Sequence, residues 1–287
     1  AYYYHYLPRP PFNNSEEALK AVKADALSRG IPLRYYQWDD WWFYNGGHWE
    51  YQAIPSVFPD GLTDWLQSPL SLYTGEYGAN NPYRSRFEFV DHNAKTVLPV
   101  DIEFYRELFR NGTKAGMKMF EQDYLSSINL GTNLTSLDLN SGDRFFEAMN
   151  QAALEMNITL QLCMMHPCHA LAASSLQAVT NARASPDHVR VYEHREEMIG
   201  WNSLLLSSLG VWSSRDNVWT NSSETRPSFN NETDVVTNTI LAVLAGGPYG
   251  PGDAAGAMNR SLIMRTCRSD GVMLRADYPN VPLDKTF

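Results

Sequence analysis

Residues 102–124, IEFYRELFRNGTKAGMKMFEQDY, combine an amphipathic helical pattern with an apolar run that ends in acidic residues. Ile102, Tyr105 and Leu108 recur at the spacing of one helix face. The run that follows, Met117–Tyr124, predicts a buried strand. A helix that leads directly into a buried strand is the repeating unit of parallel α/β folds, so this stretch indicates that fold class.

The alternation of strand and helix extends through the rest of the chain, which suits one domain over residues 1–287. Apolar runs predict eight strands, at Ala1–Leu7, Leu33–Trp38, Leu70–Tyr73, Met117–Tyr124, Ile158–Met165, Leu176–Asn181, Leu209–Trp212 and Thr239–Ala245. Predicted helices include one with N-cap Asn14 and Glu17 three residues later, one that ends at Asn111-Gly112, one along Phe145–Met156 that ends near Asn157, and one over Glu193–Ser208. Eight strands, most of them followed by a helix, predict a (β/α)8 TIM barrel. A doubly wound open sheet is the alternative, and no G-x-G-x-x-G motif supports it.

Composition and charge exclude several classes of protein. With 23 basic and 32 acidic side chains the net charge is −9, which argues against nucleic-acid binding, because phosphates require a basic surface. No apolar run reaches the roughly 18–20 residues that a membrane-spanning helix needs. The three cysteines, Cys163, Cys168 and Cys267, are too few for a disulfide-framed fold. A zinc site of Cys163 and Cys168 with His166 and His169 would need the second ligand pair of a closed site, so a buried strand thiol is the simpler interpretation of Cys163.

Asparagine sequons predict a glycoprotein of the secretory pathway. The chain has seven N-x-S/T sequons, whereas its 21 asparagines and 38 serines and threonines would give about three by chance. The sequons lie at Asn13, Asn111, Asn133, Asn157, Asn221, Asn231 and Asn259. Since N-glycans are added in that pathway, we expect a secreted (extracellular) or lysosomal protein in a mature or trimmed form.

Acidic and aromatic residues recur where the predicted strands end, and this is the edge that carries the chemistry of a (β/α)8 barrel. Acetal cleavage needs one carboxylic acid to protonate the leaving oxygen and a second carboxylate at the anomeric centre. Aromatic rings cover the apolar faces of sugars. The combination predicts a carbohydrate site that needs no metal ion or organic cofactor. The candidates are Trp38, Asp39, Asp40, Tyr73, Asp123, Arg183, Asp187, Trp212, Arg215 and Asp216.

The acidic candidates also have purely structural interpretations. Asp39-Asp40 would cap a turn, Asp123 would form a buried ion pair, and Asp187 would be a helix N-cap. Asp216 would do no more than pair with Arg215. A carboxyl group at the end of an apolar strand is costly unless it is used, which favours catalysis for Asp123.

At these positions the chain resembles clan-D retaining glycoside hydrolases, the group of melibiase-type α-galactosidases and raffinose-synthase-like proteins. Gly30–Trp42 resembles their second-strand segment, and Phe58–Leu62 resembles their FP-x-GL helix start. Phe120–Tyr124 lies where they place the nucleophile, Arg183–Asp187 resembles their R-x-S-x-D acid/base segment, and Trp212–Asp216 resembles the segment that follows. The order and spacing of these short motifs over nearly the whole chain carry the resemblance.

The resemblance implies a retaining O-glycosyl hydrolase that acts on α-galactoside-like carbohydrate by double displacement. Asp123 would attack the anomeric carbon, and Asp187 would protonate the leaving oxygen and then activate water, with the two carboxyl groups about 5–5.5 Å apart. The other candidates would hold the sugar. The chain departs from the family where Glu121 replaces the lysine of a K-x-D pattern and Trp41 replaces glycine. The C-terminal β-sandwich of the family is not expected in this chain.

A different class of function stays open, namely a catalytically inactive barrel that serves as a glycan-binding or structural extracellular glycoprotein. Glu121 and the missing sandwich motivate it, and open carboxylates in a sugar pocket would argue against it. Transglycosylation would use the same residues as hydrolysis. The expected partner is a carbohydrate, without nucleic acid or a membrane span, and a homo-oligomer or a larger extracellular assembly is left open.

Overall fold

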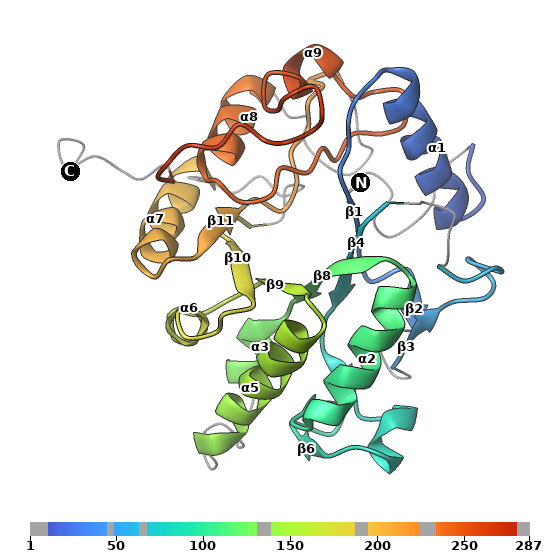
Figure 1. The fold of residues 1–287 in the computed structure, drawn as a ribbon, viewed down its shortest axis with the longest axis vertical. Coiled ribbons are helices and arrows are strands. Elements are labelled where there is room, and N and C mark those ends of the chain that lie inside the picture. Colours follow the sequence, from blue (N-terminus) through green and yellow to red (C-terminus); the bar gives the residue numbers. More distant parts are fainter. Residues whose placement is uncertain are drawn as a thin grey trace. The chain divides into compact units, whose positions relative to one another are not determined.

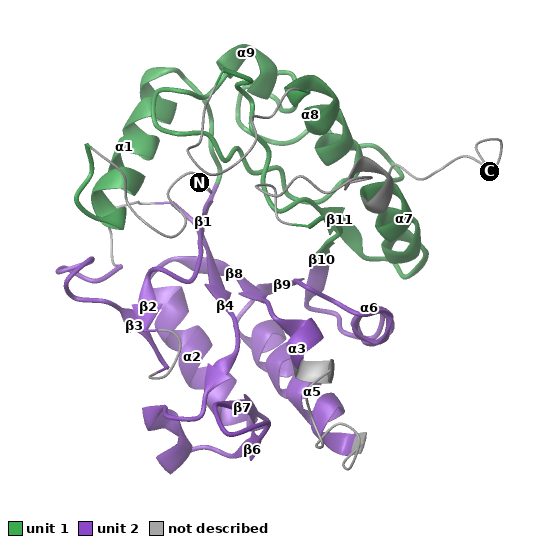
Figure 2. Ribbon diagram, turned by 180° about the vertical axis from the view of Figure 1, so that it is seen from behind, with its two compact units in different colours: residues 1–34, 181–287 green, residues 35–180 purple. Residues whose placement is uncertain are grey.

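The computed structural model describes residues 11–44, 49–62, 68–130, 139–186, 195–223 and 234–279. Residues 35–180 form one compact unit, and residues 1–34 with 181–287 form another (Figure 2). The boundary between them falls inside strand β10 (Val179–Arg183). None of the described helices is long and apolar enough to cross a membrane.

The 35–180 unit is built on parallel strands with α-helices alongside them, as the strand–helix alternation predicts (Figure 1). The strands pair in the order β1-β4-β8-β9, and each neighbouring pair is parallel. They are β1 (Tyr36–Trp38), β4 (Leu70–Thr74), β8 (Met117–Gln122) and β9 (Thr159–Leu162), and the helices are α2 (Ile102–Lys114), α3 (Leu125–Leu130), α5 (Leu139–Glu155) and α6 (Pro167–Ala173). Each of these strands overlaps a run that the sequence predicts as a strand.

Small antiparallel pairings, which the sequence pattern does not predict, lie between the parallel strands along the chain. The pairs are β2 (Phe43–Tyr44) with β3 (Glu50–Ala53), and β7 (Thr96–Pro99) with β5 (Tyr77–Gly78) and β6 (Phe89–Asp91), with a short 3-10 helix at Pro82–Ser85. Aromatic rings pack in this region. The ring centroids of Trp49 and Tyr77 are 5.0 Å apart, and those of Trp42 and Tyr51 are 4.7 Å apart. Because Trp42 and Trp49 are buried, these two rings belong to the core and cannot cover a sugar.

Alternation along the parallel strands separates an apolar face from a polar one. Phe120 of β8 points toward the helices, where its ring lies 5.1 Å from that of Phe109 in α2. Its neighbour Glu121 therefore points to the opposite face, and the register aligns it with Tyr73 and Gln161 on the adjacent strands. The buried polar residues at odd positions are Ser71, Tyr73, Glu121, Asp123 and Gln161. Burial of polar groups is costly, so this face is the candidate functional face of the unit.

Helix α2 begins where the sequence predicts but continues beyond its predicted end. Its N-cap Asp101 accepts a hydrogen bond from the backbone N–H of Glu103 at 2.9 Å. Gly112 does not end the helix, because it is the position where the Met117 side chain packs so closely that a Cβ would collide with it. Gly116, with a φ of 94°, ends the helical segment instead.

The other unit contains both ends of the described chain. Its elements are α1 (Ser15–Ser28), most of β10, α7 (Arg195–Ser208), β11 (Trp212–Ser214), α8 (Val235–Leu244) and α9 (Arg260–Ile263). β10 and β11 pair in parallel. Helix α1 begins as predicted, because Asn14 accepts a hydrogen bond from the N–H of Glu17 at 2.9 Å, and the Glu17 carboxylate accepts one from the N–H of Asn13 at 2.9 Å.

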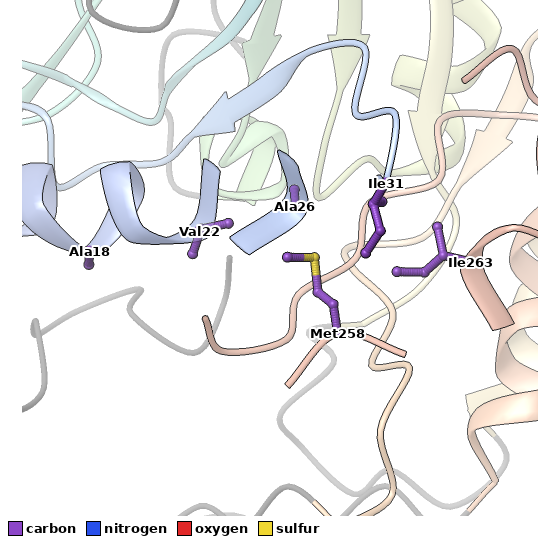
Figure 3. Close-up of a cluster of buried hydrophobic side chains, with 6 residues drawn as sticks. All are labelled: Ala18, Val22, Ala26, Ile31, Met258 and Ile263. Carbon is purple, nitrogen blue, oxygen red and sulfur yellow. The ribbon is translucent and has the colours of Figure 1, made fainter. Parts of the chain in front are cut away.

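Helix α1 buries its apolar side against the C-terminal part of the chain. Val22 and Ala26 share a buried cluster with Ile31, Met258 and Ile263 (Figure 3). These five side chains are at most 7% exposed, so the helix depends on residues from the far end of the sequence for its core.

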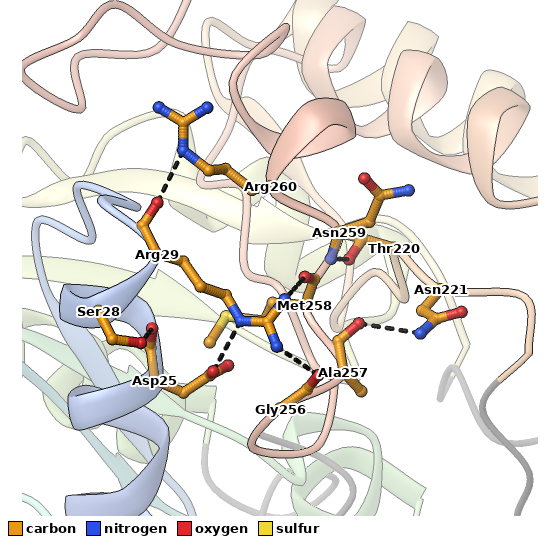
Figure 4. A network of polar contacts seen from close by, with 10 residues as sticks. All are labelled: Asp25, Ser28, Arg29, Thr220, Asn221, Gly256, Ala257, Met258, Asn259 and Arg260. Carbon is orange, nitrogen blue, oxygen red and sulfur yellow. Dashed lines mark hydrogen bonds and ion pairs between the residues drawn. The ribbon is translucent and has the colours of Figure 1, made fainter.

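Polar contacts of Arg29 reinforce the same junction (Figure 4). Its guanidinium donates to the carbonyls of Gly256 at 2.6 Å and Met258 at 3.2 Å, and it pairs with the Asp25 carboxylate at 2.7 Å. The Arg260 side chain donates in return to the Arg29 carbonyl at 2.7 Å. The C-terminal end of α1 is therefore fastened by backbone carbonyls near α9.

The predicted eighth strand is a helix. Thr239–Ala245 lies almost wholly inside α8, whose N-cap Asp234 accepts a hydrogen bond from the first turn at 3.0 Å. An apolar run of this length suits either element, and the cap favours the helix. After this helix, Gly246 forms an isolated parallel β-bridge with Ser213 of β11. Because the first predicted strand, Ala1–Leu7, lies outside the described residues, the mixed α/β class is confirmed while the closed eight-stranded barrel and the single domain stay predictions.

Candidate active site

Hydrogen bonds fix the backbone around Asp123 at the end of β8. Its N–H donates to the Thr74 carbonyl at 2.8 Å, which carries the β4–β8 pairing one residue further. The Gln122 amide nitrogen donates to the carbonyls of Asp123 at 2.8 Å and Gly75 at 3.1 Å. The Tyr77 hydroxyl holds that amide in place by donating to Gln122 Oε1 at 2.8 Å. The position of Asp123 is therefore set by both strands.

Tyr73 of β4 is a direct partner of the Asp123 carboxylate. Asp123 is 7% exposed, and its Oδ2 accepts a hydrogen bond from the Tyr73 hydroxyl at 3.2 Å. Burial raises the pKa of Tyr73 well above its usual value, and the charges of Asp123 and Asp39 raise it further. The hydroxyl therefore stays protonated and remains a donor. A donor of this kind favours the ionised form of a carboxyl group, which is the form that a nucleophile requires.

Asp39 and Asp40 directly follow β1. The N–H of Asp40 donates to Asp39 Oδ1 at 2.7 Å. Burial raises the pKa of Tyr124, and the charges of Asp123, Asp40, Glu76 and Asp39 raise it further. Tyr73 and Asp123 are thus in direct contact, and the charges of Asp39 and Asp40 act on the tyrosine that follows Asp123.

Trp38 belongs to the core of the unit. Its ring is fully buried and stacks on that of Phe58 with a centroid distance of 5.1 Å. A ring without exposed surface cannot cover a sugar, so Trp38 supports the segment that carries Asp39.

Glu121 occupies the polar face two residues before Asp123. It is 3% exposed, and its carboxylate accepts a hydrogen bond from the side-chain amide of Gln37 in β1. Burial raises the pKa of Tyr35, and the charge of Glu121 raises it further. A carboxylate therefore stands where the resembling family has lysine. Sequence reasoning missed Gln37, although a polar side chain within an aromatic strand was the available signal.

In the other unit, Arg183 and Asp216 form an ion pair beyond the paired ends of β10 and β11. Arg183 Nη1 lies 3.0 Å from Asp216 Oδ1, and both side chains are mostly buried, at 10% and 13% exposure. The N–H of Asp216 donates to the Ser185 hydroxyl at 3.0 Å, and the Asn217 amide donates to Asp216 Oδ2 at 3.2 Å. Both residues are held in fixed orientations, which suits a hydrogen-bonding role.

Trp212 begins β11, whereas the sequence predicts that it ends a strand. The turn at Gly210, with a φ of 76°, delays the strand, so the predicted bounds Leu209–Trp212 are wrong. The ring therefore lies at the opposite end of the strand from Asp216. The Arg275 guanidinium lies 3.4 Å from the ring centroid, so one face of Trp212 already has a partner.

Arg215 contacts helix α8. It is 5% exposed, and its guanidinium donates to the backbone carbonyl of Asn238 at 3.2 Å and to the Asn238 side-chain oxygen. Its contacts connect β11 with α8.

Asp187, the expected acid/base, lies outside the described residues, so its separation from Asp123 stays a prediction. Four sequon asparagines are exposed, namely Asn13, Asn111, Asn157 and Asn259. Asn221 is half-buried and its amide nitrogen donates to the Ala257 carbonyl at 3.0 Å (Figure 4). The remaining two sequons, Asn133 and Asn231, lie outside the described residues.

The histidines near the end of β9 have structural partners, and Cys163 is a buried thiol. The N–H of His166 donates to His169 Nδ1 at 3.0 Å, which caps helix α6. Burial, together with a smaller effect of the neighbouring His166, lowers the pKa of His169 to about 4. Within the part of the chain that the structure describes, no group of three or more His, Cys, Asp or Glu side chains could hold a metal ion.

Comparisons of the fold identify its class. No protein-family model and no curated protein matches the chain. An α-galactosidase from Thermus thermophilus, solved in complex with stachyose, aligns with a TM-score of 0.62 and 16% identity over 91% of this chain and 62% of that one. A GH27 β-L-arabinopyranosidase from Geobacillus stearothermophilus aligns with a TM-score of 0.60 and 14% identity over 85% of this chain and 69% of that one.

The chain therefore has the fold of clan-D glycoside hydrolases of the GH27 type, and the resemblance that the sequence motifs indicate is confirmed at the level of the fold. It spans about 62% of the length of the α-galactosidase. At identities of 14% and 16% the likeness concerns the fold, and the activity has to be argued from the site.

Proposed function

We propose that the protein is a retaining glycoside hydrolase that acts on α-galactoside-like carbohydrate. The observation that carries the proposal is the Asp123 carboxylate, which is buried at the end of a parallel strand and accepts a hydrogen bond from the Tyr73 hydroxyl. In barrel enzymes the ends of such strands carry catalytic groups. The α-galactosidase with a similar fold, solved with stachyose, supports an α-galactoside as the substrate class.

In the first step, Asp123 attacks the anomeric carbon as the bond from that carbon to the leaving oxygen breaks. Asp187, assigned by the motif resemblance, gives its proton to the leaving oxygen, so the products are a glycosyl ester of Asp123 and a free alcohol. In the second step Asp187 takes a proton from water, whose oxygen attacks the same carbon and releases Asp123. Two inversions give net retention of configuration.

The remaining polar groups have distinct tasks in this proposal. Tyr73 positions the nucleophile and stabilises its charge. Asp39 and Asp40 accept hydrogen bonds from sugar hydroxyls beside Asp123. The motif resemblance assigns further hydroxyl contacts to Arg183 and Asp216, which orient each other within their own unit.

The proposal is tested by turnover of a panel of aryl α- and β-glycosides, galactosides included. We expect the wild type to hydrolyse an α-galactoside and to release the α-anomer first, as seen by NMR. Asp123→Asn should lower kcat/KM by about 10,000-fold, because the nucleophile is lost. Asp60→Asn, at an exposed aspartate of the same unit, is the matched control and should retain activity.

A 2-deoxy-2-fluoro-α-galactosyl fluoride should leave a sugar ester on the peptide that contains Asp123, detected by mass spectrometry. No turnover of any glycoside by folded, glycosylated protein would contradict the proposal. That outcome would favour an inactive barrel that binds glycans or has a structural role in the extracellular space.

We also propose that the protein is a glycoprotein of the secretory pathway, either secreted or lysosomal. The exposed sequon asparagines Asn13, Asn111, Asn157 and Asn259 support this. Endoglycosidase treatment of protein from its native source should lower its mass. Unmodified peptides at all four positions would contradict the proposal.

A further inference from the structure

Two neighbouring parallel strands are followed by non-glycine residues with a left-handed backbone. Tyr124 after β8 has a φ of 56°, and Met164 after β9 has a φ of 49°. The register pairs Gln122 with Leu162, so Tyr124 and Met164 stand at equivalent positions on adjacent strands. Within the described ranges the other such residue is Asn157 after helix α5, where the conformation is common for asparagine.

The surroundings of Tyr124 hold it in this unfavourable conformation. The Tyr124 carbonyl accepts a hydrogen bond from the N–H of Ser127 in α3 at 3.0 Å, and the Ser127 hydroxyl lies 2.8 Å from this carbonyl and 2.7 Å from Glu76 Oε1. The preceding residue, Asp123, is also fixed. Its N–H donates to the Thr74 carbonyl, and the Asp123 carbonyl accepts a hydrogen bond from the Gln122 side-chain amide. Strain of this kind persists where the structure determines it, and it concentrates at functional sites.

Gly75, in the loop after β4, makes room for the Tyr124 side chain. A Cβ at residue 75 would lie 3.1 Å from the Tyr124 ring and 3.0 Å from the Tyr73 hydroxyl. The Tyr124 ring therefore lies against this loop, beside the hydroxyl that holds Asp123. Even so, Tyr124 is 41% exposed, and Met164 is 39% exposed. Two large side chains are thus held at the end of the strands with much of their surface in water, although burial would be favourable.

We propose that Tyr124 and Met164 form an apolar platform that binds the leaving group of the substrate, and that the enzyme prefers glycosides whose leaving group is an alkyl or aryl group. The inference rests on the proposed function, because the place of the reacting sugar is defined by Asp123. In this proposal the reacting sugar is placed at the buried Asp123 carboxylate, and its leaving group extends over Tyr124 and Met164, which follow the ends of β8 and β9. An aromatic ring and a flexible thioether are well suited to contact hydrocarbon groups.

The test compares hydrolysis of methyl and hexyl α-D-galactoside. The two alcohols have similar acidity, so the chemical step is matched and the ratio of kcat/KM reports contacts with the leaving group. In the wild type we expect the hexyl compound to be favoured by about tenfold, because several methylene groups become buried. Tyr124→Ala and Met164→Ala should each bring the ratio toward one. Tyr278→Ala, at a tyrosine that is 83% exposed elsewhere in the chain, is the control and should keep the wild-type ratio.

Calorimetric binding of the same two glycosides separates this inference from the proposed function. Hydrolysis of both compounds with equal kcat/KM would overturn the platform and leave the hydrolase proposal standing. Absence of hydrolysis, with tighter binding of the hexyl compound that Tyr124→Ala abolishes, would support the platform and contradict the hydrolase. Equal affinity for the two compounds, or no binding of either, would overturn the platform.

Discussion

The segments that follow β8 and β11 each carry an aspartate, and the two carboxylates are held in different ways. Asp123 accepts a hydrogen bond from the neutral Tyr73 hydroxyl, with Asp39 nearby. Asp216 pairs with the Arg183 guanidinium and accepts a hydrogen bond from Asn217. A guanidinium compensates the charge of a carboxylate, whereas a neutral hydroxyl orients it and leaves the charge in place. The position of an aspartate at a strand end therefore makes it a candidate site residue. Its hydrogen-bonding and ionic partners determine whether the carboxylate suits nucleophilic attack or the orientation of a substrate.

The largest effect on stability should come from Arg183→Met, which leaves the mostly buried Asp216 carboxylate without its guanidinium. We expect the free energy of unfolding to fall by about 3 kcal/mol. Urea denaturation measures it. The control is Arg268→Met, since Arg268 and Asp270 form an exposed pair at 2.9 Å whose loss should cost less than about 0.5 kcal/mol. Equal losses in the two variants would show that burial does not distinguish the pairs.

The two units should respond to pH with opposite signs. Burial raises the pKa of Asp253 to about 6 from 3.8, so its folded form binds more protons, and stability falls as the pH rises through about 6. The pKa of His169 is lowered from 6.5 to about 4, so its contribution is present above pH 6.5 and is lost as the pH falls toward 4. The Asp253 contribution should amount to about 2 kcal/mol.

Urea denaturation between pH 4 and 7.5 checks this difference with one variant for each unit. Asp253→Asn should remove the fall in stability that occurs as the pH rises through about 6. His169→Asn should remove the rise in stability that occurs as the pH rises from about 4 to 6.5. Asparagine can still accept the hydrogen bond that the N–H of His166 donates to His169. The prediction fails if either substitution leaves the pH profile unchanged.

Tyr73→Phe tests the neutral hydroxyl at Asp123. Loss of one buried hydrogen bond should cost about 1 kcal/mol of stability. Because the hydroxyl favours the ionised carboxylate, its removal should raise the pKa of Asp123 and shift the acid limb of kcat/KM to higher pH. Tyr105→Phe, which removes another buried hydroxyl 3.3 Å from that of Tyr77, should cost similar stability without moving the limb. An unmoved limb in Tyr73→Phe would indicate that the hydroxyl has only a structural role.

An effect of similar size to that of Tyr73→Phe concerns the backbone of Tyr124. Tyr124→Gly and Tyr124→Ala both remove the ring, but glycine also relieves the left-handed conformation, so the glycine variant should be more stable by about 1 kcal/mol. At Asn157, where asparagine tolerates this conformation, replacement by glycine should change stability little. Paired urea denaturation curves measure both differences. An alanine variant as stable as the glycine variant would mean that the backbone at Tyr124 carries no strain.

The sequence predicts the elements whose signals are local. The cap at Asn14 and the strand that leads to Asp123 are found where predicted, because a capping box and an apolar run are set by neighbouring residues. The predicted strand Thr239–Ala245 is a helix, and Gly112 lies inside one, because an apolar run suits both elements and the glycine serves a contact with Met117.

For the candidate site, the sequence correctly places acidic residues at strand ends but not the partners of each side chain. The spacing of sequence motifs does not show whether a ring faces solvent. The structure places Trp38 in the core and Trp212 against the Arg275 guanidinium. Gln37 and the left-handed backbone of Tyr124 have no sequence motif and depend on neighbouring strands. Such tertiary features need the structure.

The junction between Arg29 and the segment near α9 determines when the first helix can finish folding during synthesis. Residues 35–180 are continuous, so all their mutual partners are available once that stretch has left the ribosome. Helix α1 emerges earlier, but Gly256 and Met258, which bind Arg29, are among the last described residues to be made. Until then the apolar side of α1 is uncovered, and contacts between distant parts of a chain form slowly. The apolar side of α1 therefore waits for its partners longer than any pair of contacting residues within 35–180 does.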